Sequence, residues 1–397
     1  MSAPRRTRPS NRKELILAAA ADRFRDQGFH DVGMADIAEA VGIGPSALYR
    51  HYRGKQELLV AVLDGGLTAF EDAIAGAGDW HDCVRRAADV AFDDRAFGRM
   101  WDRDRGVLSS GERAAFRERI NAMAHALAAR LPQVPEVTDP QRSTIAFAVL
   151  ALLWLPARRP PGLPVGEQRR ALISVAEAMV TDGLDRLAAR ADLPRPAEGE
   201  GARPAERPAL PVSRREALLI VATDQFARYG YPNVGLEDIG QAAGIAGPSV
   251  YNYFDTKVDI AVRILSRAAD ALWLDLDRVL HLSPDPATAL DRVVTGYVSF
   301  ATGHPALMRV VTAQPGNLPE PAQQVVDQRS REYAKEWVAL VSQVRPDLAE
   351  RYVAFVVRCA IDVINGTNYL HRVRGDAVTA DIVDLVRAVL VVTFGGE

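Results

Sequence analysis

Residues 12–58 read RKELILAAAADRFRDQGFHDVGMADIAEAVGIGPSALYRHYRGKQEL, and residues 214–260 read RREALLIVATDQFARYGYPNVGLEDIGQAAGIAGPSVYNYFDTKVDI. Aligned without gaps at an offset of 202 residues, the two stretches are identical at 16 of 47 positions. Average composition alone would give about three identities. Because the offset is close to half of the 397 residues, the sequence predicts two copies of a protein joined end to end, each about 200 residues long.

The stretch between the two copies has the composition of a linker. Residues 191–212 read ADLPRPAEGEGARPAERPALPV and contain five prolines and two glycines. Such a segment breaks helical and strand periodicity and stays solvated. A structureless loop of this length inside one domain is uncommon, so we expect a linker here.

Each repeated segment has glycine and proline residues at the positions where its helices should begin and end. In the first copy Gly28 is placed to end a helix, Gly42 to make a tight turn after a short helix from about Met34, and Pro45 to open a third helix. Two short helices joined by a glycine turn predict a helix-turn-helix.

The second copy repeats these signals. Ser213 and Glu216 predict a capping box, Gly230 a helix end, Gly244 the turn and Pro248 the start of the third helix. The proline is shifted by one position relative to the first copy, so the third helix is expected to start one residue later.

The remaining residues predict an all-α protein. Apolar residues recur at spacings of three and four, no run alternates as a strand does, and proline and glycine fall at intervals that suggest about nine helices per copy. The net charge of −3 excludes a globally basic protein but leaves room for a local basic face.

Several protein classes are excluded by what the sequence does not contain. Two cysteines rule out a disulfide framework, and no metal-ligand spacing or catalytic motif occurs, so we expect no enzyme, no metal and no cofactor. The start is basic but has no apolar segment typical of a signal peptide. The longest uncharged stretch, residues 143–157, is shorter than the ~20 residues of a membrane span. A cytoplasmic location is expected.

Both segments resemble the N-terminal DNA-binding domain of the TetR/AcrR family of bacterial transcriptional regulators. The residues that carry the resemblance are Gly28, Asp36-Ile37-Ala38, Gly42-Ile43, Leu48-Tyr49-Arg50-His51-Tyr52 and Lys55, with Gly230, Asp238-Ile239-Gly240, Gly244-Ile245, Val250-Tyr251-Asn252-Tyr253-Phe254 and Lys257 in the second copy. The resemblance implies two TetR-like halves, each with a three-helix DNA-binding domain and a helical ligand-binding and dimerisation bundle. The implied boundaries are 1–57 and 58–190 for the first half, 191–212 for the linker, and 213–259 and 260–397 for the second half.

The resemblance also assigns roles to residues. The third helix would enter the major groove, and Leu48 and Tyr52, or Val250 and Phe254, would be core. The implied DNA-binding residues are Gly44, Pro45, Ser46, Ala47, Tyr49, Arg50, His51 and Lys55 in the first copy, and Gly247, Pro248, Ser249, Tyr251, Asn252, Tyr253 and Lys257 in the second. Within these sets the tyrosines, His51 and the lysines would meet phosphates.

The segments depart from the family in two ways. Gly33 and Gly235 stand before the second helix, where the family commonly has a hydroxyl residue that caps the helix and meets a phosphate. The recognition surface also carries few long donors, which leaves Arg50 and Asn252 as candidates for a base edge or a nearby phosphate. Arg5, Arg6 and Arg8 form a basic arm before the first copy that could add phosphate or minor-groove contacts.

The C-terminal part of each half would supply an interface and an effector site. Apolar segments at 144–155, 171–187, 349–370 and 379–392 are candidates for a four-helix interface. Denser aromatic residues with polar tips favour the second half for an unidentified small hydrophobic effector. The candidates are Trp273, Tyr297, Phe300, His304, Met308, Tyr333 and Trp337.

The sequence therefore favours a ligand-responsive transcriptional repressor that binds a double-stranded DNA operator as a single-chain pseudo-dimer with two heads. A further homodimer stays open. The alternative is a helical protein-interaction or ligand-binding protein whose heads have weakened DNA binding, because the recognition helices carry few long side chains. Because Arg50 faces Asn252 and His51 faces Tyr253 in the alignment, we expect the two halves of the operator to differ in sequence.

Overall fold

The computed structural model describes residues 12–93, 95–104, 107–154, 163–191, 212–313, 320–370 and 375–394. Most of the predicted linker and the Arg5, Arg6 and Arg8 arm lie outside these residues. Within them the chain is helical and has no strand, and each half contributes nine α-helices. The all-α class predicted from the sequence is confirmed.

The first half runs from α1 to α9. Its helices are α1 (Arg12–Gln27), α2 (Met34–Ala40), α3 (Pro45–Leu48), α4 (Lys55–Ala75), α5 (Trp80–Asp93), α6 (Arg95–Asp104), α7 (Ser110–Ala128), α8 (Asp139–Leu153) and α9 (Val165–Arg190).

The second half follows the same order. Its helices are α10 (Arg214–Tyr229), α11 (Leu236–Ala242), α12 (Gly247–Val250), α13 (Lys257–Leu282), α14 (Pro286–Gly303), α15 (Pro305–Ala313), α16 (Glu320–Val344), α17 (Glu350–Leu370) and α18 (Asp376–Leu390), with a short 3₁₀ turn at Tyr231–Asn233.

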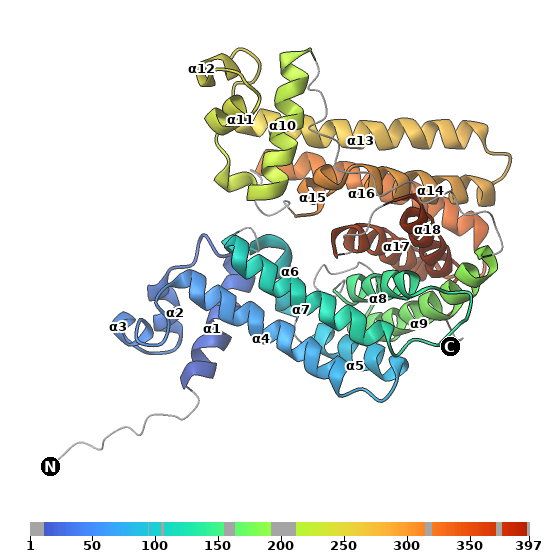
Figure 1. The fold of residues 1–397 in the computed structure, drawn as a ribbon, viewed down its shortest axis with the longest axis horizontal. Helices are drawn as coiled ribbons and strands as arrows, with labels where there is room; N and C mark the ends of the chain where they lie inside the picture. Colours follow the sequence, from blue (N-terminus) through green and yellow to red (C-terminus); the bar gives the residue numbers. More distant parts are fainter. Residues whose placement is uncertain are drawn as a thin grey trace.

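Three short helices at the start of each half form a head, and the remaining helices form a body. We call residues 12–57 the first head and residues 213–259 the second head. Both heads lie on the same side of the molecule, with α2 and α3 below and α11 and α12 above in Figure 1. The boundaries at 57/58 and 259/260 fall inside the continuous helices α4 and α13, so each head is joined to its body by an unbroken helix.

The two bodies meet through the last two helices of each half. Helix α8 packs against α17, and α9 packs against α18; Figure 1 shows these four helices together on the side away from the heads. We call this packed surface the seam. Its helices contain most of the four segments whose apolar sequences suggested an interface, although residue 155 lies outside the described part.

Small residues let the seam helices approach closely. A side chain added at Gly366 would place its Cβ 2.5 Å from Ala151 Cβ, and one at Gly183 would lie 2.7 Å from Leu385 Cδ2. Real Cβ atoms do not come this near their neighbours, so a larger residue at Gly366 would press on Ala151, and one at Gly183 would require Leu385 to move. The two crossings join α17 to α8 and α9 to α18, and each therefore holds one half against the other.

A network of charges also crosses the seam. Asp381 and Asp384 of α18 are 4% and 6% exposed. Arg190 at the end of α9 pairs with Asp381 and places Nη1 3.3 Å from Asp384 Oδ2, while Gln141 Nε2 donates to Asp381 Oδ1 at 3.3 Å. Burial raises the pKa of Asp381, although Arg190 and Gln141 favour its charged form. The first half thus supplies the cation that pairs with the buried Asp381, while Asp384 is also paired with Arg387 of its own half, whose Nη1 lies 3.0 Å from Asp384 Oδ1.

The cores of the two heads join the body differently. Buried residues of the first head, both bodies and the seam form one continuous apolar cluster. The second head has a cluster of its own, which includes Val310 of α15, because α10 packs on α15. The predicted capping box at Ser213 is only half formed. Its hydroxyl accepts from Glu216 N at 3.5 Å, but the Glu216 carboxylate pairs with Arg267 instead.

Candidate nucleic-acid interface

Glycines with positive φ set the turns of both heads at equivalent positions. Gly28 and Gly230 follow the first helix with φ of 91° and 81°, and Gly42 and Gly244 make the next turn with φ of 68° and 69°. Residues with a Cβ rarely adopt these angles. The glycines predicted to end the first helix and make the turn are confirmed in both copies, and they fix the angle between the second and third helices.

The third helix starts at the same place in the two heads, so the expected one-residue shift is wrong. Helix α3 begins at Pro45 and α12 at Gly247, which are 202 residues apart. Pro248 occupies the second helical position instead of the first. Amide groups in the first turn have no partner inside the helix, so proline is accepted at either position.

The second helix is capped by backbone, as expected from its glycine. Gly33 N donates to Asp36 Oδ2 and Gly235 N donates to Asp238 Oδ2, both at 2.7 Å. Because glycine has no side chain, only this half of a capping box exists, and no hydroxyl is present there to meet a phosphate. The aspartate of the Asp-Ile motif is therefore a structural residue whose role sequence reasoning missed.

Lys55 and Lys257 bind the backbone of their own heads. Lys55 Nζ donates to the carbonyl oxygens of Phe29 and His30 at 2.6 and 3.2 Å and lies 4.4 Å from the Phe29 ring centre. Lys257 Nζ repeats these contacts with Tyr231 and the next carbonyl, at 2.9 and 3.4 Å, and lies 4.4 Å from the Tyr231 ring centre. Both lysines hold the loop after the first helix onto the long fourth helix. A phosphate contact for them stays a prediction.

The predicted core residues of the third helix are buried. Leu48 and Val250 are 0% exposed, and Tyr52 and Phe254 are 3% and 4% exposed. In each head a cation lies over the buried aromatic ring. Lys13 Nζ is 5.8 Å from the Tyr52 ring centre, and the Arg215 guanidinium is 4.9 Å from the Phe254 ring centre.

The residues expected to meet DNA lie on the surface. Tyr49 and Tyr251 are 53% and 56% exposed, which is far more than a packing tyrosine would show. Arg50, His51 and Asn252 are also exposed, and Tyr253 is partly so. The other predicted contact residues follow the same pattern: Gly44, Pro45, Ser46 and Pro248 are exposed, and Ala47, Gly247 and Ser249 are half-buried. The third helix, which ends at Leu48 or Val250, and the turn that follows it therefore present one polar and aromatic face to solvent in each head.

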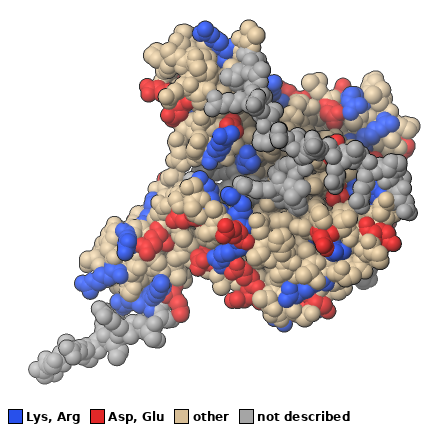
Figure 2. Space-filling view, in the orientation of Figure 1, with Lys and Arg blue, Asp and Glu red and all other residues tan. Residues whose placement is uncertain are grey.

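Charge is distributed differently over the two faces. Residues 33–57 contain three cations and three carboxylates, whereas residues 235–259 contain one cation and four carboxylates. Arg53 of the first head faces Asp255 of the second in the alignment, and Ala35 faces Glu237. The space-filling view shows Lys and Arg side chains gathered on the lower head (Figure 2).

Comparison with known proteins matches both heads to one family. The sequence profile described as "Bacterial regulatory proteins, tetR family" matches residues 16–62 and again residues 218–264. The chain belongs to the TetR family through both of its heads. The two matches confirm the internal duplication predicted from the repeat.

Relatives of known function are transcriptional regulators. The chain is 34% identical over 86 residues to the HTH-type transcriptional activator FasR of Mycolicibacterium smegmatis, covering 21% of this chain and 39% of FasR. It is 26% identical over 150 residues to the HTH-type transcriptional repressor KstR2 of the same species, covering 36% of this chain and 73% of KstR2. The match therefore spans well under two thirds of FasR. Both relatives are named as transcriptional regulators, one an activator and one a repressor.

Solved structures of transcriptional regulators each align with slightly less than half of the chain. A regulator from Bordetella parapertussis aligns with 45% of this chain and 93% of its own, at 23% identity and a TM-score of 0.42. KstR2 of Mycobacterium tuberculosis aligns with 45% of this chain over 94% of its own, at 22% identity and a TM-score of 0.40.

The structure brings four of the seven effector candidates together. Tyr297 lies between Tyr333 and Trp337, with ring centres 5.9 and 5.8 Å away, and Trp273 meets Tyr333 edge-on at 5.8 Å. Burial raises the pKa of Tyr297 and of Tyr333. Phe300 instead stacks on His304, whose Nδ1 lies 3.0 Å from the Phe300 carbonyl oxygen. The remaining candidate, Met308 of α15, is buried.

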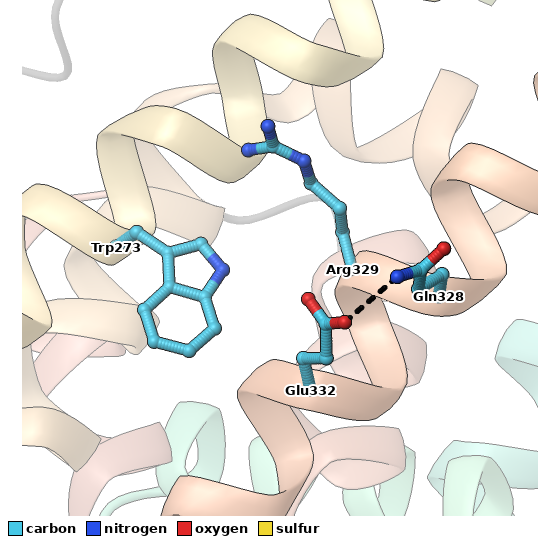
Figure 3. Close-up of a pocket in the computed structure, with 4 residues that line it drawn as sticks. All are labelled: Trp273, Gln328, Arg329 and Glu332. Carbon is cyan, nitrogen blue, oxygen red and sulfur yellow. Dashed lines mark hydrogen bonds between the residues drawn. The ribbon is translucent and has the colours of Figure 1, made fainter.

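A pocket of about 530 Å³ opens beside this aromatic cluster, between α13 and α16. Trp273 lines it together with Gln328, Arg329 and Glu332; Figure 3 shows the indole on one side and the three polar side chains on the other. Gln328 Nε2 donates to Glu332 Oε1 at 2.9 Å. These three polar residues were missed because nothing in their sequence distinguishes them from a solvated helix face.

Two further observations concern only the described residues. No helix among them is long and apolar enough to cross a membrane. They also contain no group of three or more His, Cys, Asp or Glu side chains placed to hold a metal ion.

Proposed function

We propose that this chain is a DNA-binding transcriptional regulator that acts as a single-chain pseudo-dimer. The observation that carries the proposal is the pair of TetR-family heads on one side of one molecule, each exposing a tyrosine-bearing third helix. Helix-turn-helix dimers bind two half-sites about one helical turn, or a multiple of it, apart. The seam supports the single-chain form, because it joins the two bodies as the subunits of a dimer would be joined.

The charge network favours pairing of unlike halves over pairing of like halves. Two second halves meeting through α18 would bury two copies of Asp381 without Arg190, while each Asp384 would keep the Arg387 of its own half. A buried charge without a partner is strongly unfavourable. The first half of the same chain supplies that partner, which supports one chain as the working unit.

A gel-shift titration on the DNA upstream of the gene, repeated over a salt series, tests this proposal. A regulator that neutralises phosphates should lose affinity steeply as salt rises. Selection of sites from a random pool should then recover two unlike half-sites in one fixed polarity, because Arg50 faces Asn252. An absence of DNA binding that weakens with salt would favour the alternative of a helical interaction protein.

We also propose that a small hydrophobic effector binds in the second half beside Trp273. The pocket volume of about 530 Å³ falls in the usual range for small-molecule sites, about 300–1,000 Å³. Titration with 1-anilinonaphthalene-8-sulfonate as the probe should show binding that Trp273→Ala weakens. The matched control, Trp80→Phe in the first half, should bind the probe as the unaltered chain does.

A further inference from the structure

We infer that the two heads contribute unequally to DNA binding: the first head supplies most of the electrostatic contact with the phosphates, and the second head adds little. The inference rests on the proposed function and concerns how that function is divided between the heads. It comes from matched backbone positions that carry different charges.

The two faces are built on equivalent backbones, so their side chains can be compared directly. Tyr52 N donates to Leu48 O at 3.1 Å, and Phe254 N donates to Val250 O at 3.2 Å. The rings of Tyr52 and Phe254 are buried at the same place in each head. The residues that flank them therefore project from the same positions relative to the third helix.

On this shared backbone the first head exposes two cations where the second exposes none. Arg50 and Arg53 are exposed, and in the described part of the chain their guanidinium groups have no ion-pair or hydrogen-bond partner. Asn252 and Asp255, also exposed, occupy the equivalent positions. Exchanging an arginine for an aspartate replaces attraction to a phosphate with repulsion.

A second change adds negative charge beside the third helix of the second head. A Cβ at Gly247 would lie 3.4 Å from Glu237 Cγ, so this exposed acidic side chain runs alongside the first turn of α12. The equivalent residue of the first head is Ala35. Since Lys257 is the one cation of residues 235–259 and is bound to carbonyl oxygens, residues 235–259 carry no uncommitted positive charge.

The phosphate backbone dominates the affinity of proteins for DNA, and each neutralised phosphate contributes about 0.9 to the slope of log affinity against log salt. The unequal charges therefore predict unequal slopes. Replacing the arginines of the first head by their second-head equivalents, Arg50→Asn with Arg53→Asp, should lower the slope by about two. The reverse exchange, Asn252→Arg with Asp255→Arg, should raise it.

The test is a salt series on the full chain with a 40-base-pair duplex of random sequence. The first-head variant should bind about tenfold or more weakly than the unaltered chain, whereas the second-head variant should bind more tightly. Arg85→Asn with Arg86→Asp makes the same change in net charge on exposed residues of α5 and should leave the slope unchanged. Arg50→Lys with Arg53→Lys keeps both positive charges and should also leave the salt slope unchanged.

Equal losses of affinity when either head is made one charge more negative would overturn the inference and leave the proposed regulator standing. For that comparison Asn252→Asp and Tyr251→Ala in the second head are measured against Arg50→Asn and Tyr49→Ala in the first. An unaltered chain that shows no salt-dependent binding would overturn both the inference and the proposed function. A thermal melt of each variant separates a lost contact from a head that has failed to fold.

Discussion

Lys55 and Lys257 stand 202 residues apart and donate to equivalent carbonyl oxygens in their heads, whereas Arg53 and Asp255, at the same offset, carry opposite charges. The heads thus repeat each other in the contacts that hold them together and differ in the surface they expose. The interior of a helix-turn-helix tolerates few geometries, because its short helices must share one small core. Its surface has no such constraint, so the two heads can differ in how much each contributes to DNA binding.

At the seam the two halves are neither alike nor simply different: their side chains are complementary. Arg190 comes from the first half, and Asp381 and Asp384 come from the second. The molecule therefore combines a repeated framework, a divergent surface and a complementary junction. The predictions that follow test each of these relations.

The largest effect is expected at the junction. Arg190→Ala would leave the buried Asp381 without its cation, whereas Asp384 would keep its pairing with Arg387. Breaking a buried pair by removing one partner costs about 3 kcal/mol or more. Urea unfolding of the full chain measures the loss. Arg186→Ala, on the same helix, is the matched control and should change the free energy of unfolding by no more than about 0.5 kcal/mol. Similar losses from the two variants would show that the halves are not held by this charge pairing.

The next effect tests whether the two frameworks are interchangeable. Ala38 is fully buried in the first head. Its equivalent is Gly240, where a Cβ would lie 2.7 Å from Val250 Cγ2 and 3.0 Å from Ile245 O. Gly240→Ala should therefore destabilise the second head by about 1–3 kcal/mol through overpacking. Adding Val250→Ala should recover part of the loss. Ala38→Gly makes the opposite change in the first head and should cost about 1 kcal/mol, through helix propensity.

If Gly240→Ala were neutral, the tight approach of α11 to α12 would not be a constraint, and the frameworks would be more alike than the structure indicates. Hydrogen exchange of the α10–α12 amides, compared with those of α1–α3, locates the effect in one head.

A smaller and equal effect is expected for the two lysines. Lys55→Met and Lys257→Met keep the apolar stem but remove the ammonium group that binds two carbonyl oxygens and an aromatic ring. Each should lower the free energy of unfolding by about 1 kcal/mol, the usual net contribution of such hydrogen bonds. If the lysines also meet phosphates, each variant should flatten the salt dependence of DNA binding by about one unit. A loss of stability without a change in slope would assign them to the framework alone.

The sequence predicted what depends on neighbours in the chain. The glycine turns follow from local conformational rules, the resemblance to the family implied the buried Leu48 and Val250, and the apolar stretches marked the seam helices. The start of α12 was predicted one residue too late because Pro248 was read as a first helical residue, although it is equally accepted at the second.

Contacts between distant residues could not be predicted in this way. Gln141 and Asp381 are 240 positions apart, and no local pattern pairs them. The resemblance assigned the lysines to phosphates, which stays a prediction. Their binding to carbonyl oxygens was missed because it depends on how α1 packs on α4, and α10 on α13. Trp273 was found by its aromatic character, but Glu332 and Arg329 look like any solvated helix face until the two helices are brought together.

The smallest effect concerns how the junction responds to pH. Burial raises the pKa of Asp381 above the ordinary value of 3.8 despite the nearby Arg190, so the folded chain holds this proton at a pH where the unfolded chain has released it. Between those two pKa values the unfolding free energy must fall as the pH rises, because the native state binds more protons. Asp381→Asn removes this group, so the stability difference between the two chains should change with pH only in that window. Urea unfolding at closely spaced pH values measures it. A difference that grew in favour of the unaltered chain as pH rose would mean that Arg190 and Gln141 outweigh burial. The junction would then gain stability from its charges, and not only the specificity that pairs a first half with a second.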